Sequence, residues 1–95
     1  MHIITKSRLR EFWEEHPAAQ VPLARWFHIT RRAIWADFAS VRRDFPQADV
    51  VGIYVVFNVG GNKFRLIAEI NYQWRKVFIR GVLTHREYDK DAWKP

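Results

Sequence analysis

The stretch that decides the fold is YVVFNVGGNKFRLIAEINYQWRKVFIRGVL, residues 54–83. Apolar and polar residues alternate in three runs, at 54–58, 63–70 and 76–83, and a period of two is typical of β-strands. Gly60-Gly61 separates the first two runs and favours a hairpin, because both glycines accept a positive φ. The stretch therefore predicts a small antiparallel sheet.

The residues before this stretch have a helical pattern instead. Apolar side chains recur at helical spacing over 9–16, with Ser7 as the expected N-cap and Pro17 as the end. A second amphipathic run covers 23–34. A short third helical turn is expected over 40–45, an edge strand over 2–5, and a turn or short helix in the tail from Thr84.

These elements predict an α+β fold. Two N-terminal amphipathic helices are expected to pack on one face of the antiparallel sheet, with residues 1–95 forming a single domain.

Alternation sorts the strand residues onto two faces. Pairing Val59 with Asn62, and closing a second two-residue loop at 73–74, gives an apolar core face of Val55, Phe57, Phe64, Leu66, Ala68, Ile70, Val77, Ile79 and Leu83. The other face is half apolar and half basic, and is expected to be open: Tyr54, Val56, Asn58, Lys63, Arg65, Ile67, Glu69, Phe78, Arg80 and Val82. Its cations suit a phosphate, although alternating charges also serve simply to solvate an exposed face.

The composition favours a nucleic-acid partner. Sixteen basic residues against ten acidic ones give a net charge of +6, and eleven of the sixteen are arginines, which suit phosphate. A merely soluble basic protein remains the alternative on charge alone. The absence of cysteine excludes a disulfide scaffold, a thiolate zinc site and a cysteine nucleophile.

Membrane and metal sites are not expected. No apolar run approaches the roughly 20 residues that a spanning helix needs, and the first residues contain no stretch of signal-peptide length. The four histidines have no metal-ligand spacing, so neither a metal nor a cofactor is predicted.

Residues 55–66, VVFNVGGNKFRL, resemble the V-V-F-N-x-G-G-N-K-Y/F-R-L segment of HigB-type toxins. The segments 70–72, 77–80 and 84–90, and the N-terminal residues 9–17, agree with the same family in the same order. HigB-type toxins are similar to the RelE superfamily of small α+β ribonucleases. The resemblance implies an mRNA interferase of the bacterial cytoplasm that acts on translating ribosomes and is neutralised by a HigA-type helix-turn-helix antitoxin.

The resemblance also implies where the site lies. The expected catalytic residues are three sheet cations and two proton-transfer candidates in the tail: Lys63, Arg65, Arg80, His85 and Tyr88. The expected RNA-binding residues are Asn58, Asn71, Phe78, Asp89 and Lys90. Which of the two tail residues is acid or base stays open, because RelE-like toxins differ in this respect. Asp89 either orients His85 or caps a backbone group, and capping is the expectation.

Two other functions are compatible with the same residues. One is a non-catalytic basic RNA-binding module, and the other is a protein-interaction domain whose basic face meets an acidic partner. Alanine at His85 or Tyr88 separates an enzyme from a binder, since an enzyme loses cleavage but keeps its affinity for RNA.

Overall fold

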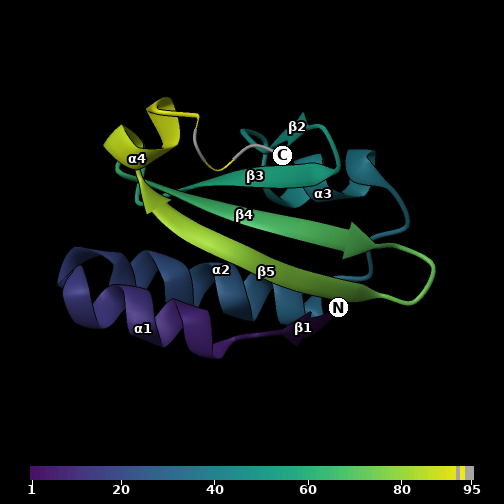
Figure 1. Ribbon diagram of the computed structural model, residues 1–95. Helices are drawn as coiled ribbons and strands as arrows, with labels where there is room; N and C mark the ends of the chain where they lie inside the picture. The colour runs from purple at the N-terminus through teal and green to yellow at the C-terminus, as the bar shows by residue number, and fades with distance from the viewer. Residues whose placement is uncertain (92, 94–95) are drawn as a thin grey trace.

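The computed structural model describes residues 1–91 and 93 (Figure 1). The helices and strands, in chain order, are β1 (His2–Ile4), α1 (Ser7–Glu15), the 3₁₀ helix η1 (Pro17–Ala19), α2 (Gln20–Arg32), α3 (Phe38–Asp44), β2 (Asp49–Val51), β3 (Tyr54–Val59), β4 (Phe64–Asn71), β5 (Lys76–Thr84) and α4 (His85–Asp89). None of the helices in these residues is long and apolar enough to span a bilayer.

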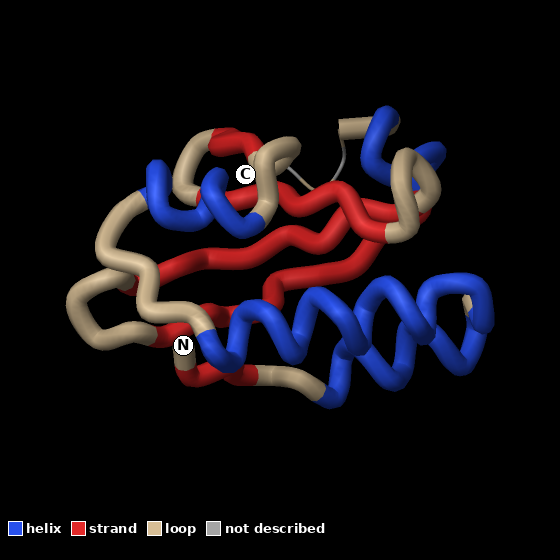
Figure 2. The backbone as a smooth tube through the Cα atoms, turned by 180° about the vertical axis from the view of Figure 1, so that it is seen from behind, coloured by secondary structure: helices blue, strands red, loops and turns tan. Residues whose placement is uncertain are grey.

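The five strands form one sheet in the order β1-β5-β4-β3-β2. The pairs β2–β3, β3–β4 and β4–β5 are antiparallel, whereas β1 runs parallel to β5. Helices α1 and α2 lie side by side against one side of the sheet, as the ribbon and the backbone tube both show (Figures 1 and 2). The α+β class with two N-terminal helices on one face is therefore confirmed, although the sheet is mixed and has an unpredicted strand, β2.

The helix starts differ from the prediction in two places. Lys6 is the N-cap of α1 and makes no side-chain cap, so Ser7 is the first helical residue rather than the cap. Helix α3 begins before the predicted turn because Asp37 caps it, with Oδ1 accepting from the Ser40 backbone N–H at 2.9 Å. The hydrogen bonds from Ser40 lower the pKa of the Asp37 carboxyl below its ordinary value.

The core lies between the helices and the sheet. Phe57 of β3 is fully buried, and the rings of Trp26, Trp35 and Phe45 pack around it with centroids 5.1–6.2 Å away. Edge-to-face and offset contacts of this kind stabilise a core beyond the area they bury. This cluster fixes α2 and α3 on the face of the sheet that the alternation predicts.

The hairpin between β3 and β4 is longer than predicted. Val59 pairs with Phe64, so residues 60–63 form a four-residue turn, with Gly60 and Gly61 at φ of 65° and 67°. Phe57 consequently lies opposite Leu66 instead of Phe64. A shift of two residues keeps every side chain on its predicted face.

The hairpin between β4 and β5 contains a β-bulge that the sequence did not predict. Ala68 pairs with Ile79 as expected, but the register changes between Ile67 and Ala68, so that Leu66 pairs with Val82. One extra residue in β5 exchanges the faces beyond that point. The predicted faces of Val82 and Leu83 are therefore wrong: Val82 packs against the core, and Leu83 lies opposite Arg65.

Candidate active site

Helix α4 is fixed at the end of the sheet by the β3–β4 turn. The backbone N–H of His85 donates to the carbonyl of Lys63 at 2.9 Å. Thr84 and Glu87 form a capping box, in which Thr84 Oγ1 accepts from the Glu87 N–H at 3.2 Å and Glu87 Oε1 accepts from the Thr84 N–H at 2.9 Å. The tail therefore begins with an ordered turn directly beside the Gly-Gly hairpin.

The capping box also perturbs a carboxyl group. Its hydrogen bond to the Thr84 backbone lowers the pKa of Glu87 below the ordinary value of 4.5, and the nearby charges of His16 and Lys90 act in the same direction. Glu87 is therefore held as a carboxylate that orders the first turn of α4.

Arg65 is a buried cation at the centre of this region. Only 8% of its surface is exposed. Its guanidinium donates to the carbonyls of Asn62 and Phe64 at 3.2 and 3.0 Å, and to Asn62 Oδ1 at 3.2 Å. The ring of Tyr88 lies over the guanidinium, 5.4 Å from its central carbon. The hairpin and α4 thus hold a fixed positive charge between them.

The tail folds back over the face that the sequence predicts to be open. Trp93 stacks on Tyr88 with centroids 5.0 Å apart, its Nε1 donates to the Tyr88 carbonyl at 2.9 Å, and its ring lies 6.3 Å from that of Tyr54. Val56 and Ile67, which belong to this face, are each only 3% exposed. The prediction of an open face is therefore wrong for its central part, because alternation carries no information about a segment that returns later.

His85 and Asp89 form a pair on the exposed side of α4. Nδ1 of His85 lies 2.7 Å from Oδ2 of Asp89, the spacing of one helical turn. Both side chains are about half exposed. The carboxylate thus orients the imidazole, whereas backbone capping had been expected, and the other ring nitrogen, Nε2, lies on the far side of the ring from Asp89.

Two more predicted residues lie next to Arg65. Asn58 is its direct partner on β3, and the Asn58 amide donates to Gln47 Oε1 at 3.0 Å. Lys63 lies in the turn rather than in a strand, with an exposed side chain. The structure therefore brings Asn58, Lys63, Arg65, His85 and Tyr88 together around one hairpin end.

Arg80 lies apart from this group. It is the extra residue of the bulge in β5, between Ile79 and Gly81, and its guanidinium pairs with Glu69 at 3.1 Å and lies 5.0 Å from the centre of the Phe78 ring. Glu69 is four residues along β4 from Arg65, or about 13 Å at ordinary strand rise. Among the described residues, no hydrogen bond or ion pair connects Arg80 with His85 or Tyr88. Arg80 and Phe78 thus form a second basic position further along the sheet.

The remaining predicted RNA-binding residues are more distant or peripheral. Asn71 lies at the opposite end of β4, where its Oδ1 accepts from the Trp74 N–H at 3.0 Å and closes the 72–75 turn. Lys90 is the exposed C-cap of α4. Residues 1–91 and 93 contain no group of three histidine, aspartate or glutamate side chains arranged to hold a metal ion.

Sequence patterns did not identify two residues that hold site residues in place, Asn62 and Trp93. Asn62, which holds Arg65, follows the glycine pair, and an asparagine in a turn is a usable signal for such a role. The contact of Trp93 with Tyr88 has no such signal, because it depends on how the tail returns to the sheet.

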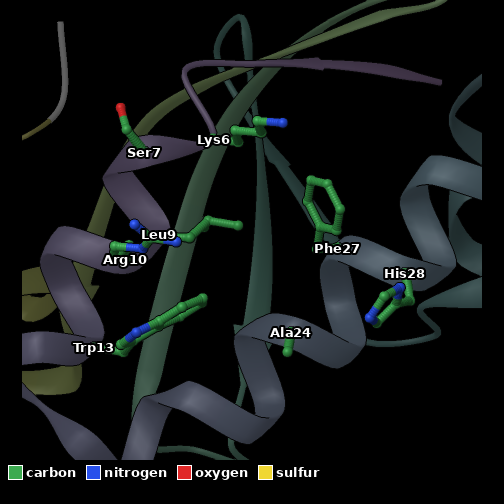
Figure 3. A pocket seen from close by; sticks show the side chains of 8 residues that line it. All are labelled: Lys6, Ser7, Leu9, Arg10, Trp13, Ala24, Phe27 and His28. Carbon is green, nitrogen blue, oxygen red and sulfur yellow. The ribbon is translucent and has the colours of Figure 1, made fainter.

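A groove between α1 and α2 contains none of the predicted site residues. It has a volume of about 470 Å³, and Figure 3 shows Leu9 and Trp13 extending from α1 toward α2. Lys6 and Arg10 add positive charge to its lining, which also includes His28.

Comparison with known proteins identifies the family of this chain. The family described as HigB_toxin, RelE-like toxic component of a toxin-antitoxin system, matches residues 19–91. The chain is 33% identical to the mRNA interferase toxin HigB of Escherichia coli strain K12 over 92 residues, which cover 94% of this chain and 88% of that protein. It is 30% identical to the mRNA interferase HigB of Escherichia coli O6:H1 over 93 residues, or 95% and 90% of the two chains. Since the family match covers most of the chain and the relatives cover nearly all of it, this protein belongs to the HigB family of RelE-like toxins.

Proposed function

We propose that this protein is an mRNA endoribonuclease that cleaves mRNA in the decoding site of translating ribosomes in the bacterial cytoplasm. We further propose that residues 1–95 act as a single toxin domain, neutralised by a HigA-type helix-turn-helix antitoxin. The similarity to proteins named mRNA interferase supports the substrate and the reaction. The net charge of +6 supports a polyanionic partner.

One observation carries the proposal. A buried guanidinium, an oriented imidazole and a phenol project from one hairpin end and the helical turn attached to it: Arg65, His85 and Tyr88. Cleavage of RNA through its 2′-hydroxyl needs a stabilising cation, a base and an acid close together. Arg65 supplies a charge whose position is fixed before substrate binds, which is the arrangement that stabilises a transition state best.

The reaction we propose uses only groups of the protein and the RNA. The 2′-oxygen attacks the neighbouring phosphorus while a base removes its proton, and the bond from phosphorus to the 5′-oxygen breaks as an acid protonates that oxygen. The products are a 2′,3′-cyclic phosphate and a 5′-hydroxyl. Arg65, helped by Lys63, stabilises the charge on the phosphoryl oxygens. No metal takes part in this scheme.

His85 and Tyr88 are the two proton carriers, and which of them is the base is left to experiment. The contact with Asp89 orients the His85 ring, so that Nε2 is the nitrogen that meets the RNA. The ring of Tyr88 covers the Arg65 guanidinium, so a bound phosphate has to approach Arg65 past the edge of the Tyr88 ring.

The more distant residues are assigned to RNA binding. We assign Arg80, beside Phe78, to a phosphate further along the RNA strand, where the RNA would replace Glu69 as its partner. Lys90 adds exposed charge at the end of α4. We assign Asn71 only a peripheral contact with RNA at the far end of the sheet, because its side-chain oxygen is already bonded to the Trp74 N–H in a turn.

The test is cleavage of mRNA on purified ribosomes, with both new ends identified chemically. His85→Ala is expected to lower the cleavage rate by about 10²–10⁴, the usual contribution of a positioned acid or base, while RNA affinity stays unchanged. Arg32→Ala is the control, since it removes an exposed positive charge at the end of α2 and should leave cleavage intact.

Two results would refute the enzyme assignment. Wild-type protein that binds RNA without producing a cyclic or 3′-phosphate end would be a binding module. A His85→Ala variant that cleaves at the wild-type rate would place the chemistry elsewhere.

A further inference from the structure

Two adjacent hollows lie beside the β3–β4 turn. The larger one, about 530 Å³, opens between α2 and the turn, and the smaller one, about 230 Å³, opens between the turn and residues 44–48. They adjoin each other and together make up the cleft, because they share four lining residues: Asp44, Phe45, Asn58 and Gly61. Volumes of this order accommodate a small ligand such as a nucleotide.

The cleft is lined by two residues of the candidate active site, Asn58 and Lys63. Asn58, which lines both hollows, is the direct cross-strand partner of Arg65 and lies on the same face. Lys63 also lines the larger hollow, and its carbonyl accepts from the N–H of His85, the first residue of α4. An RNA chain held at Arg65 therefore has to pass only around the hairpin turn to enter the cleft.

The smaller hollow presents a pair of amides. Because the Asn58 amide nitrogen donates to Gln47 Oε1, the Asn58 carbonyl oxygen and the Gln47 amide nitrogen remain as an acceptor and a donor. Both residues line the hollow together with Phe45 and Pro46, whose apolar surfaces suit contact with a base. A neighbouring donor and acceptor beside an apolar wall is the arrangement that reads the edge of a nucleobase.

Charge distinguishes the two ends of the cleft. Arg25 and Lys63 line the larger hollow and favour a phosphate there. Asp44 lines both hollows and accepts a hydrogen bond from Trp35 at 2.9 Å. Its carboxylate disfavours a phosphate in the smaller hollow, where neither cation contributes to the lining, but it suits the amino groups of a base.

We infer that this cleft is a second nucleotide site, which binds the nucleotide next to the cleaved phosphate and selects its base through Asn58 and Gln47. Arg25 and Lys63 hold the phosphate of that nucleotide without regard to sequence. The inference rests on the proposed ribonuclease function and adds the residues that set its sequence preference.

The experiment is cleavage of an mRNA library with a randomised codon in the ribosomal decoding site, followed by sequencing of the new ends. Asn58→Ala and Gln47→Ala should each reduce the preference at one position flanking the cut by about 5-fold to 100-fold, the range for loss of a base-edge contact. Arg25→Ala should instead raise KM alike for all sequences. Gln73→Ala, an exposed glutamine in the turn at the other end of the sheet, is the matched control.

The outcomes separate this inference from the proposed function. If wild type and both amide variants cleave with the same base distribution, the subsite is refuted while the ribonuclease stands. An Arg25→Ala variant that alters base preference, or leaves KM unchanged, would overturn the division of the cleft. If wild type does not cleave at all, the proposed function itself fails. Thermal melting of each variant identifies any that is unfolded, and Gln47→Glu, which removes the amide donor from an exposed side chain, then provides the same test.

Discussion

The hydroxyl of Tyr88 can be tested apart from its ring. Within the described residues it has no hydrogen-bond partner, whereas the ring stacks on Trp93 and covers Arg65. Tyr88→Phe keeps both ring contacts, so the free energy of unfolding should change by less than about 0.5 kcal/mol, as at other sites without buried contacts. If the hydroxyl transfers a proton, however, cleavage should fall by about 10²–10⁴.

Tyr88→Ala provides the contrasting variant. It removes a stacked pair and a cation–π contact at a half-buried site, together about 1–2.5 kcal/mol, which corresponds to a melting temperature lower by about 5–15 °C. The assays are cleavage of mRNA on ribosomes under single-turnover conditions, and thermal unfolding followed by circular dichroism. Full activity of Tyr88→Phe would refute the proton-transfer role and leave Tyr88 as a packing residue. A large loss of stability in Tyr88→Phe would show instead that the hydroxyl has a structural partner.

Three further outcomes are expected. Arg65→Ala should lower the cleavage rate by about 10²–10³. Arg65→Lys should restore little of that rate, because an ammonium replaces the guanidinium fork. Single-turnover rates equal to that of the wild type in either variant would contradict this role of Arg65. Thermal stability should fall as the pH drops through the lowered pKa of Glu87, since a depressed carboxyl pKa stabilises the fold fully only above its ordinary value of 4.5; a Glu87→Gln variant should show a smaller decline over the same acidic range. Because EDTA strips magnesium from ribosomes, the metal test uses a short naked RNA at high enzyme concentration, where cleavage should persist in EDTA; loss of activity that zinc or manganese restores would exclude the metal-free scheme.

Alternation and glycine placement were sufficient to predict the central hairpins, because one apolar face has to be buried whatever covers it. They placed Phe57 and Leu66 in the core even though the turn is two residues longer than expected, since a shift of two preserves the face. They failed at Val82 and Leu83, where a bulge adds one residue to a strand of ordinary composition. Bulges depend on local backbone geometry that side-chain patterning does not encode.

The site was predicted less completely than the sheet. The resemblance identified Arg65, His85 and Tyr88 together, and they do lie around one hairpin end. It gave no indication that Arg65 is buried, or that Arg80 is paired with Glu69 further along the sheet. Both are consequences of tertiary contacts, the first with the returning tail and the second with a neighbouring strand.

The parallel pairing of β1 with β5 has a consequence for the order of folding. His2 pairs with Lys76, so β1 can pair only after a strand 74 residues further along the chain is available. Closing so long a loop is entropically costly, and contacts of this separation form slowly. During synthesis, β1 and the adjoining α1 emerge before the strand on which they dock exists. We therefore expect β1 and α1 to dock late, after the β3–β4–β5 meander has assembled from its local hairpins.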